Sequence, residues 1–383
     1  MNKKQTAKTI RTFSLASFLN DFGSDMIYPI WPLFVTSVLG ANMATLGFID
    51  GLGELIASIS KAGSGYISDR IKKRKIFIWT GYLFGSISRI GYAISTIWQH
   101  LIPLKIFDRF GKIRGAPRDA IIADISTKEN RGKNFGILRA MDNLGAVCGI
   151  VFCILFFELL GYRNLFLIAA IPSLISVALI LFFIKERKTH KIKIYKGISL
   201  KMLDRNFKIF LLLSSFFALS SFSYSFLLVW AKEFGFKLSF VPVLYLIFTA
   251  VAAFFSLPFG KLSDKIGRKP VLMMSFILWG LVCLSFIFIQ SYWVILLAFI
   301  LYGLHKASLD TVQTTFVCEL APAKYRSSCL GGFQMIIGLC ALPASLIAGL
   351  LWDKISMFAP FYFSLVLTMV SIFILAFVKE KHL

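Results

Sequence analysis

Charged residues are scarce in this 383-residue sequence, and acidic residues are the scarcest. Charged side chains make up 16% of the chain and hydrophobic ones 57%, whereas a soluble domain carries about 25% charged residues. The 19 acidic residues face 42 basic ones, which gives a formal net charge of +23. In a soluble protein this excess would indicate nucleic-acid binding. Here long uncharged apolar runs separate the basic clusters, so we expect no nucleic-acid partner and a protein embedded in a lipid bilayer.

The sequence also lacks the residue clusters that enzymes and metal sites require. Its four histidines are isolated, with no two at a metal-ligand spacing, so no metal site is expected. All six cysteines lie within apolar runs or at their ends, which excludes a disulfide framework. A glycine-rich nucleotide loop and a nucleophile–base pair are absent. We therefore expect no enzyme activity and no cofactor, with a proton gradient as the energy source.

Long apolar runs are what the sequence has in abundance. A helix that crosses a bilayer needs about 20 predominantly apolar residues. Such runs occur at roughly 12–39, 45–66, 76–97, 101–123, 135–157, 164–184, 207–231, 240–260, 271–290, 292–316, 330–351 and 358–378. The sequence therefore predicts an all-α membrane protein with twelve transmembrane helices.

Basic residues between the runs predict the orientation. With the N-terminus in the cytoplasm, segments 70–75, 128–133, 185–208 and 261–269 are cytoplasmic and rich in lysine and arginine. The basic residues of the opposite loops are only Arg163, Lys232, Lys237 and Lys354. This asymmetry follows the positive-inside rule, and an even number of helices leaves both termini in the cytoplasm.

The longest basic segment separates two similar halves. Residues 185–206 are predicted to form a cytoplasmic linker between an N-terminal bundle, 1–184, and a C-terminal bundle, 207–383. The halves share a repeat at an offset of 195 residues. The matching pairs are Gly65 and Gly260, Asp69 and Asp264, Asp124 and Glu319, Arg131 and Arg326, and Gly136 and Gly331. Such a repeat predicts two pseudo-symmetric six-helix bundles in the same orientation.

Two loops carry a family resemblance. The loops GYISDRIKKRK, residues 65–75, and GKLSDKIGRK, residues 260–269, resemble the two copies of the signature loop of the major facilitator superfamily. With the twelve runs and the repeat, the resemblance covers essentially the whole chain. It implies secondary transport by alternating access, without ATP. It implies a gating role for Asp69, Arg70, Arg74, Asp264 and Arg268. We expect the same role for the repeat pair Arg131 and Arg326.

Two further segments resemble a bacterial subgroup of this superfamily. They are SFLNDFGSD, residues 17–25, and APRDAIIAD, residues 116–124. The subgroup includes drug exporters and, more loosely, siderophore permeases, which implies a bacterial inner-membrane location. Gly136, Gly145 and Gly149 match the glycine spacing of the family's antiporter motif, but Ile150 stands where that motif has proline. The antiporter motif is therefore incomplete.

Basic side chains inside the apolar runs are candidates for substrate binding. A charge at the bilayer centre costs about 2.5–3.5 kcal/mol, so each must face a wet cavity or a partner. The expected substrate-binding residues are Lys61, Arg89, Lys105, Arg109, Lys112 and Tyr28. The family places an arginine in the fourth run, and the spacing leaves open whether Arg109 or Lys105 fills that place.

Acidic side chains inside the runs are candidates for proton coupling. Carboxylates one helical turn apart repel each other when both are ionised, so one of them holds a proton more readily than a lone carboxylate does. Asp21 with Asp25, and Asp50 with Glu54, have this spacing, and Asp310 lies in the tenth run. We expect proton coupling at these five residues.

A structural interpretation competes with these roles. Bases and acids of the first half nearly balance in number, so they could instead pair and lock the bundle. Such pairing is most expected for five residues of the fourth and fifth runs, which are Asp108, Asp119, Arg118, Arg139 and Asp142.

Together these features predict a monomeric secondary transporter of a small solute. The intramembrane basic residues favour a hydrophilic organic anion, such as a siderophore, moved by proton-coupled alternating access. The alternative is a proton-driven efflux pump for drugs or amphiphiles.

Overall fold

The computed structural model describes residues 3–71, 73–127, 130–186, 203–288, 291–322 and 326–380. Within these ranges the chain forms helices joined by short loops and contains no strand. The predicted all-α class is therefore confirmed. The side chains of Asp69, Arg131 and Arg326 lie outside the described part, so their predicted gating role is not addressed by the contacts below.

The chain divides into two compact units. The first comprises Met1–Gly40 and Leu52–Tyr195, and the second Ala41–Gly51 and Lys196–Leu383. The boundary at 195 lies inside the predicted linker, but residues 41–51, which the sequence assigned to the first bundle, belong to the second unit. Asp353 contributes to this placement, because its carboxylate accepts hydrogen bonds from the backbone nitrogens of Met43 at 3.1 Å and Ala44 at 2.7 Å.

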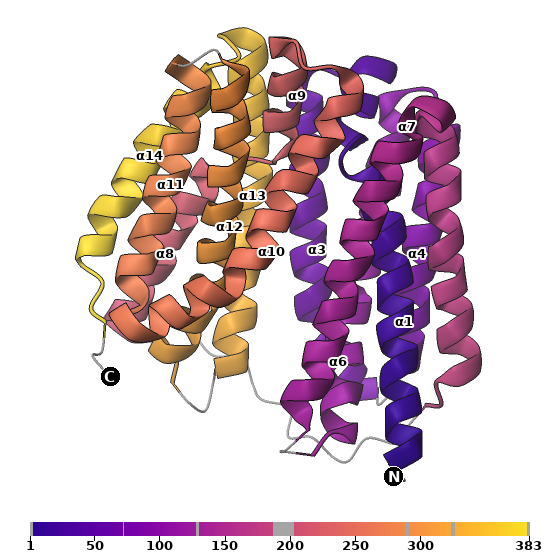
Figure 1. Cartoon of the computed structure of the whole chain (residues 1–383). Coiled ribbons are helices and arrows are strands. Elements are labelled where there is room, and N and C mark those ends of the chain that lie inside the picture. Colours follow the sequence, from indigo (N-terminus) through magenta and orange to yellow (C-terminus); the bar gives the residue numbers. More distant parts are fainter. Residues whose placement is uncertain are drawn as a thin grey trace. The chain divides into compact units, whose positions relative to one another are not determined.

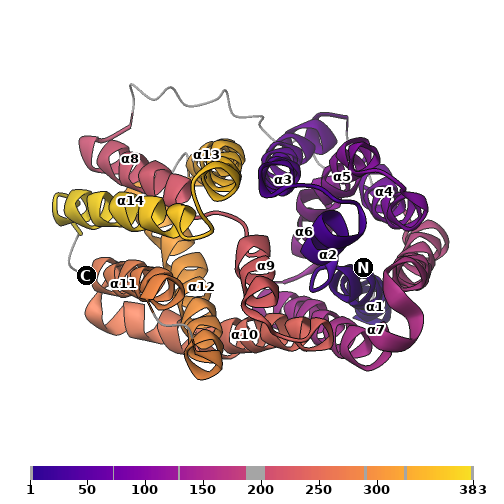
Figure 2. The same ribbon diagram turned by 90° about the horizontal axis from the view of Figure 1, so that it is seen from above.

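Unit 1 is built around a pair of long helices, α1 and α7, against which α4 packs (Figures 1 and 2). Its helices are α1 (Lys3–Ile27), α2 (Trp31–Leu33), α4 (Lys75–Ile94), α5 (Leu101–Phe110), α6 (Gly115–Ile125) and α7 (Arg131–Phe183), together with α3 (Met43–Ile71) from Leu52 onward. Helix α7 contains two predicted spans, and Gly161 inside it has φ 67°, a left-handed conformation that allows the chain to turn between them.

Two predicted spans of unit 1 are interrupted helices. The first breaks after α1 at residues 28–30, and a short π-helical segment, Phe34–Val38, follows α2. Pro29 and Pro32 lie at this break, where a helix loses backbone donors. The fourth span divides into α5, a 3-10 segment Gly111–Arg114, and α6. Both interruptions border the charged residues described below.

Unit 2 contains the remaining helices. They are α8 (Arg205–Ser220), α9 (Ser225–Phe234), α10 (Val241–Ile266), α11 (Arg268–Phe288), α12 (Tyr292–Leu320), α13 (Arg326–Lys354) and α14 (Ala359–Ala376). Helix α8 packs against α14 and α13, and α12 packs against α10 and α11 (Figure 2). Its core is aromatic, with the rings of Phe217 and Phe276 stacked at 4.1 Å between centroids.

The helical segments account for all twelve predicted spans within the described residues. Eight stretches are long and apolar enough to cross a membrane, and one of them, residues 132–183, contains two predicted spans. The other three predicted spans are helical as well, in α1, in α4 and in α5 with α6. These three carry buried charged and polar side chains, which lowers their hydropathy.

Glycines allow α1 and α7 to approach closely in unit 1. A β-carbon added at Gly145 would overlap the carbonyl oxygen of Phe18, and one at Gly149 would overlap that of Phe22. Nothing lies within 4 Å of the corresponding position at Gly136. Two of the three glycines at the antiporter-motif spacing therefore serve helix packing, as small residues four apart do in membrane bundles.

We expect Gly149→Ala to destabilise the protein by about 2 kcal/mol, because the new methyl group must displace backbone of α1. The matched variant Gly136→Ala should be neutral or stabilising by up to about 1 kcal/mol, since alanine favours the helix and meets no neighbour. Thermal unfolding of the two variants in detergent measures the difference. Equal melting temperatures would contradict the packing role of Gly149.

Candidate substrate site

The site is built on α5, where Lys105 and Arg109 lie one helical turn apart on the same face. Both side chains pass close to α3 at Gly53. A β-carbon at Gly53 would lie 3.0 Å from Cε of Lys105 and 3.2 Å from Cγ of Arg109. The absence of a side chain at Gly53 thus leaves room for the two cations beside α3.

Arg109 connects three helical segments of unit 1. Its Nη2 atom lies 3.6 Å from Oε1 of Glu54 on α3, and its Nε atom lies 3.7 Å from Oδ2 of the neighbouring Asp108. Nη1 donates to the hydroxyl of Tyr28 at 3.4 Å, and the guanidinium lies 5.3 Å from the centre of that ring. These contacts join α5 to α3 and to the break after α1.

Lys105 is buried beside an aromatic ring. The residue is 2% exposed, and its ammonium nitrogen lies 3.9 Å from the centre of the Trp31 ring, a cation–π distance. Trp31 in turn packs against Tyr92, with 4.7 Å between ring centroids. A small pocket opens here, lined by Ser24, Ile27, Tyr28, Trp31, Arg89, Tyr92, Lys105 and Asp108.

Positive charge converges on Glu54. Four cations interact electrostatically with its carboxylate, and these are, from the strongest interaction to the weakest, Arg109, Lys61, Lys112 and Lys105. Lys61 lies two turns further along α3, and Lys112 lies in the 3-10 segment after α5. Four of the predicted basic residues thus interact with the Glu54 carboxylate. The predicted Tyr28 contacts one of them, Arg109.

Arg89, which the sequence grouped with these residues, is used differently. It is buried, and its guanidinium donates to the carbonyl oxygens of Ala169 at 2.9 Å and Asn20 at 3.3 Å. It also donates to the hydroxyls of Ser24 at 2.7 Å and of Ser173. Arg89 lines the pocket, but its donors tie α4 to α1 and α7, which is a structural role.

The predicted proton-coupling carboxylates do not gather at one place. Asp50, in unit 2, accepts hydrogen bonds from the hydroxyls of Ser223 at 2.8 Å and Ser225 at 2.5 Å, whereas Glu54, in unit 1, faces Arg109. The expected Asp50–Glu54 pair therefore has separate partners.

The other candidates of this group also lie apart. The Asp21 carboxylate accepts a hydrogen bond from the Asn20 side chain at 2.8 Å. Asp310 pairs with Lys306 at 3.2 Å on an exposed part of α12. Asp25 interacts electrostatically with Tyr28. Two of the five carboxylates in the described part of the chain thus lie near the α5 cations. Glu54 faces Arg109 directly, and Asp25 interacts with Tyr28, which contacts Arg109.

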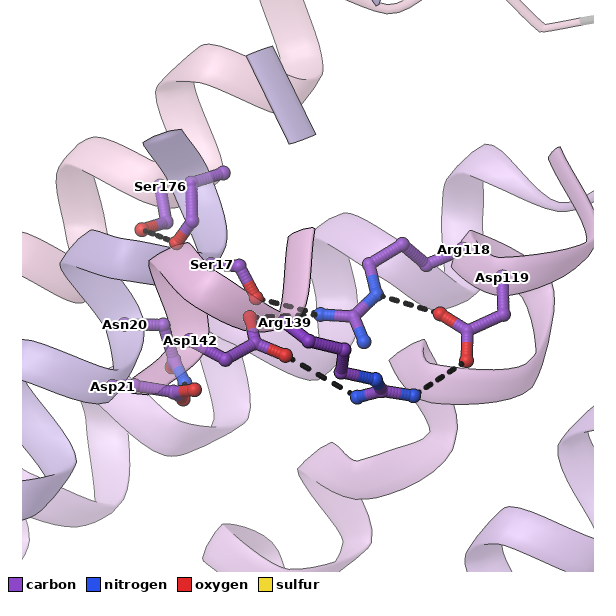
Figure 3. Close-up of polar contacts among 9 residues, drawn as sticks. Ser17, Asn20, Asp21, Arg118, Asp119, Arg139, Asp142 and Ser176 are labelled. Carbon is purple, nitrogen blue, oxygen red and sulfur yellow. Dashed lines mark hydrogen bonds and ion pairs between the residues drawn. The ribbon is translucent and has the colours of Figure 1, made fainter. Parts of the chain in front are cut away.

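Two arginines and two aspartates form a closed ring in unit 1 (Figure 3). Arg118 lies 3.1 Å from Asp119 and 3.8 Å from Asp142, and Arg139 lies 3.3 Å from Asp119 and 3.2 Å from Asp142. Arg118 also donates to the Ser17 hydroxyl at 2.6 Å. The expected structural pairing of these four residues is confirmed, and the ring is electrically neutral.

The signature loops make the same contacts in each unit. Arg74 pairs with Asp124 at 2.6 Å in unit 1, and Arg268 pairs with Glu319 at 2.9 Å in unit 2. Asp124 and Glu319 are repeat mates, so the repeat in the sequence is a repeat of ion pairs. Arg268 also contacts Asp264 at 2.6 Å. Arg70, in the last turn of α3, is exposed.

Two acidic residues of these networks were missed from the sequence. Glu186 accepts hydrogen bonds from the backbone nitrogens of Arg74 at 2.9 Å and Lys75 at 3.0 Å, at the start of α4. Glu380 does the same for Arg268 and Lys269 at the start of α11. A carboxylate at a helix N-terminus satisfies free backbone donors. The two glutamates are 194 residues apart in the sequence, one residue less than the repeat offset of 195.

The ring of Arg118, Asp119, Arg139 and Asp142 gives a matched comparison. Arg118→Gln should lower the free energy of unfolding by about 3 kcal/mol, because it removes the buried cation of the ring and leaves two carboxylates to share Arg139. Arg139→Gln should cost less than about 1 kcal/mol, since its side chain is 59% exposed against 8% for Arg118. Thermal unfolding of both variants in detergent is the measurement. A larger loss for Arg139→Gln would contradict this account of the ring.

Comparison with known proteins supports the fold and the repeat. The family model of the major facilitator superfamily matches residues 13–246 and 209–383. An uncharacterized MFS-type transporter of Methanocaldococcus jannaschii is 39% identical over 98% of this chain and 96% of its own length. The tetracycline resistance protein, class H, of Pasteurella multocida is 23% identical over 76% of this chain and 75% of its own.

Solved structures show the same architecture. A variant of the nucleoside transporter NupG has a TM-score of 0.82 at 17% identity, over 97% of this chain and 100% of its own. A bacterial homologue of the human lysosomal transporter Spinster has a TM-score of 0.71 at 14% identity, over 99% of this chain and 96% of its own. With family model, relative and fold in agreement, this chain belongs to the major facilitator superfamily of membrane transporters.

Proposed function

We propose that this transporter moves a small hydrophilic organic anion, with the anion bound at the α5 site of unit 1. The observation that carries the proposal is the clustering of cations there. Arg109, Lys61, Lys112 and Lys105 all interact with Glu54, and Arg109 also lies 3.7 Å from Asp108. Charged side chains gathered within membrane spans mark substrate pathways.

The other charged groups of unit 1 strengthen this proposal by being neutralised already. The ring around Arg118 contains two cations and two anions. Arg74 is paired with Asp124, and the donors of Arg89 are bonded within the bundle. The candidate substrate-binding cations other than Arg89 therefore lie at the α5 site.

The arrangement suits a carboxylate or a similar oxyanion. Arg109 has a planar guanidinium, a group that binds carboxylates in a bidentate manner. Lys105 adds a second cation one turn away, and the Trp31 and Tyr28 rings provide apolar surface. A polycarboxylate such as a siderophore belongs to this substrate class.

Energy would come from a proton gradient, and transport would proceed by alternating access between the two units. Paired charges at Arg74 and Arg268 are suited to act as latches because they can break and reform. The competing function is export of drugs or amphiphiles, which the resemblance to a tetracycline resistance protein brings to mind.

Transport into proteoliposomes tests the proposal. We expect an inward proton gradient to drive uptake of at least one radiolabelled hydrophilic anion, oxalate or citrate. Lys105→Gln and Arg109→Gln should each lower that uptake about tenfold or more, a loss of about 1.4 kcal/mol of binding. The matched control is Lys237→Gln, which removes an exposed lysine of unit 2 and should leave uptake unchanged.

Two results would contradict the proposal. One is transport of cationic dyes with no anion uptake, which would favour the efflux function. The other is anion uptake that survives both substitutions on α5, which would place the anion site elsewhere in the protein.

A further inference from the structure

We infer that the pocket beside α5 is a binding site for one water molecule, which bridges the Tyr92 hydroxyl of α4 and the Asp108 carboxylate of α5. This water is a fixed component of unit 1, and its presence does not depend on which substrate the protein transports. The sequence grouped Asp108 with structural ion pairs and gave Tyr92 no role.

The Tyr92 hydroxyl is one of the two groups that need a partner. It is buried and has no hydrogen-bond partner in the described part of the chain. The residue is 3% exposed, and its ring packs against Trp31 at 4.7 Å and Phe166 at 6.3 Å between centroids. These contacts restrict the ring and therefore the directions that its hydroxyl can take. Because a buried hydroxyl without a hydrogen bond costs free energy, such groups in native proteins bond to protein atoms or to ordered water.

The Asp108 carboxylate is the second group. Among the described residues it makes one ion-pair contact, between its Oδ2 atom and Nε of Arg109 at 3.7 Å, and accepts no hydrogen bond. That distance is too long for a hydrogen bond. The Asp108 side chain is only 15% exposed. Of the charged groups that act on the Tyr92 hydroxyl, Asp108 acts most strongly, so the two groups lie near each other without a direct bond.

The pocket that these two groups share has the size of a water molecule. The residues that line it with them are Ser24, Ile27, Tyr28, Trp31, Arg89 and Lys105. The volume open to the centre of a water molecule is about 10 Å³, which is about what one water needs. Cavities that stay empty in proteins are apolar, whereas polar cavities of this size hold water.

The charges around the pocket favour a neutral occupant. Arg89 and Lys105 would repel a bound cation, and Asp108 would repel a bound anion. A water molecule carries no net charge and both donates and accepts hydrogen bonds. It can donate to the Asp108 carboxylate, and the Tyr92 hydroxyl can act toward it as donor or acceptor.

The bridge gives Asp108 the solvation that its position requires. A charged side chain within a membrane span must face water or a partner. One bound water satisfies the Tyr92 hydroxyl and solvates the carboxylate at the same time, and it links α4 to α5 nearly as well as a direct hydrogen bond would. The water thus belongs to the structure of the bundle beside the α5 cations.

Footprinting by X-ray radiolysis tests for this water in the detergent-purified full chain. Radiolysis converts water to hydroxyl radicals, which oxidise side chains next to a bound water even where bulk solvent does not reach them. We expect Tyr92 to be oxidised several-fold faster than Tyr82, and Trp31 several-fold faster than Trp279. Both reference residues are similarly buried but do not line the pocket. Peptide mass spectrometry measures the four rates.

Tyr92→Phe provides a second readout, because it removes one hydrogen bond of the water. Oxidation of Trp31 should fall several-fold, and the melting temperature should fall as well. The matched control is Tyr82→Phe, whose hydroxyl also has no partner within the described residues but lies away from the pocket. It should leave Trp31 oxidation unchanged and should not lower the melting temperature, since removing an unsatisfied buried hydroxyl costs nothing.

Two results would overturn the inference. Oxidation of Tyr92 and Trp31 no faster than that of Tyr82 and Trp279 means that the pocket is dry, and this comparison needs no variant to fold. Oxidation of Trp31 that is as fast in Tyr92→Phe as in the wild-type protein means that Tyr92 does not hold the water. Neither result bears on the proposed anion transport, which the uptake measurements test separately.

Discussion

The need to neutralise charge inside an apolar medium organises this protein. Every ionised group in a membrane span must find a partner or face water, because the hydrocarbon region provides neither. Unit 1 meets this constraint in three ways. The ring of Arg118, Asp119, Arg139 and Asp142 neutralises itself, and Arg89 bonds to backbone and hydroxyl oxygens. At the α5 site, by contrast, Arg109, Lys61, Lys112 and Lys105 gather around Glu54, and this cluster of cations is the basis of the proposed function.

The same constraint explains why the two units repeat their ion pairs and not their substrate groups. Arg74 with Asp124, and Arg268 with Glu319, occur at equivalent places, and a glutamate caps the helix that begins beside each arginine. These contacts involve helix ends, where backbone donors are free in both units. The intramembrane cations have no such counterpart in unit 2, where Lys306 already pairs with Asp310 within one helix. In the proposed function, unit 1 would therefore contribute most of the groups that bind the substrate.

Sequence reasoning predicted the fold and the cluster of basic residues on α3 and α5 for different reasons. The fold followed because apolar length, basic loops and a repeat are properties of the chain itself, read along one dimension. The convergence of Lys105, Arg109 and Lys61 was also predictable, because helical spacing fixes the face on which a side chain lies. The spacing along one helix does not predict which residue of another helix a side chain contacts. Asp50 and Glu54 share a helix face, yet Asp50 bonds to Ser223 and Ser225 while Glu54 faces Arg109.

The sequence by itself thus determined the class, the number of spans and the identity of the charged residues, since these depend on composition and periodicity. Only the tertiary structure decided which charges are neutralised. Arg89 and Arg109 are both arginines within apolar runs, but one is enclosed by oxygens of α1 and α7 and the other lies beside a pocket with Lys105 and Asp108. The physical reason is that the energy of a buried charge depends on the three-dimensional positions of its neighbours, and residues from separate helices provide those neighbours.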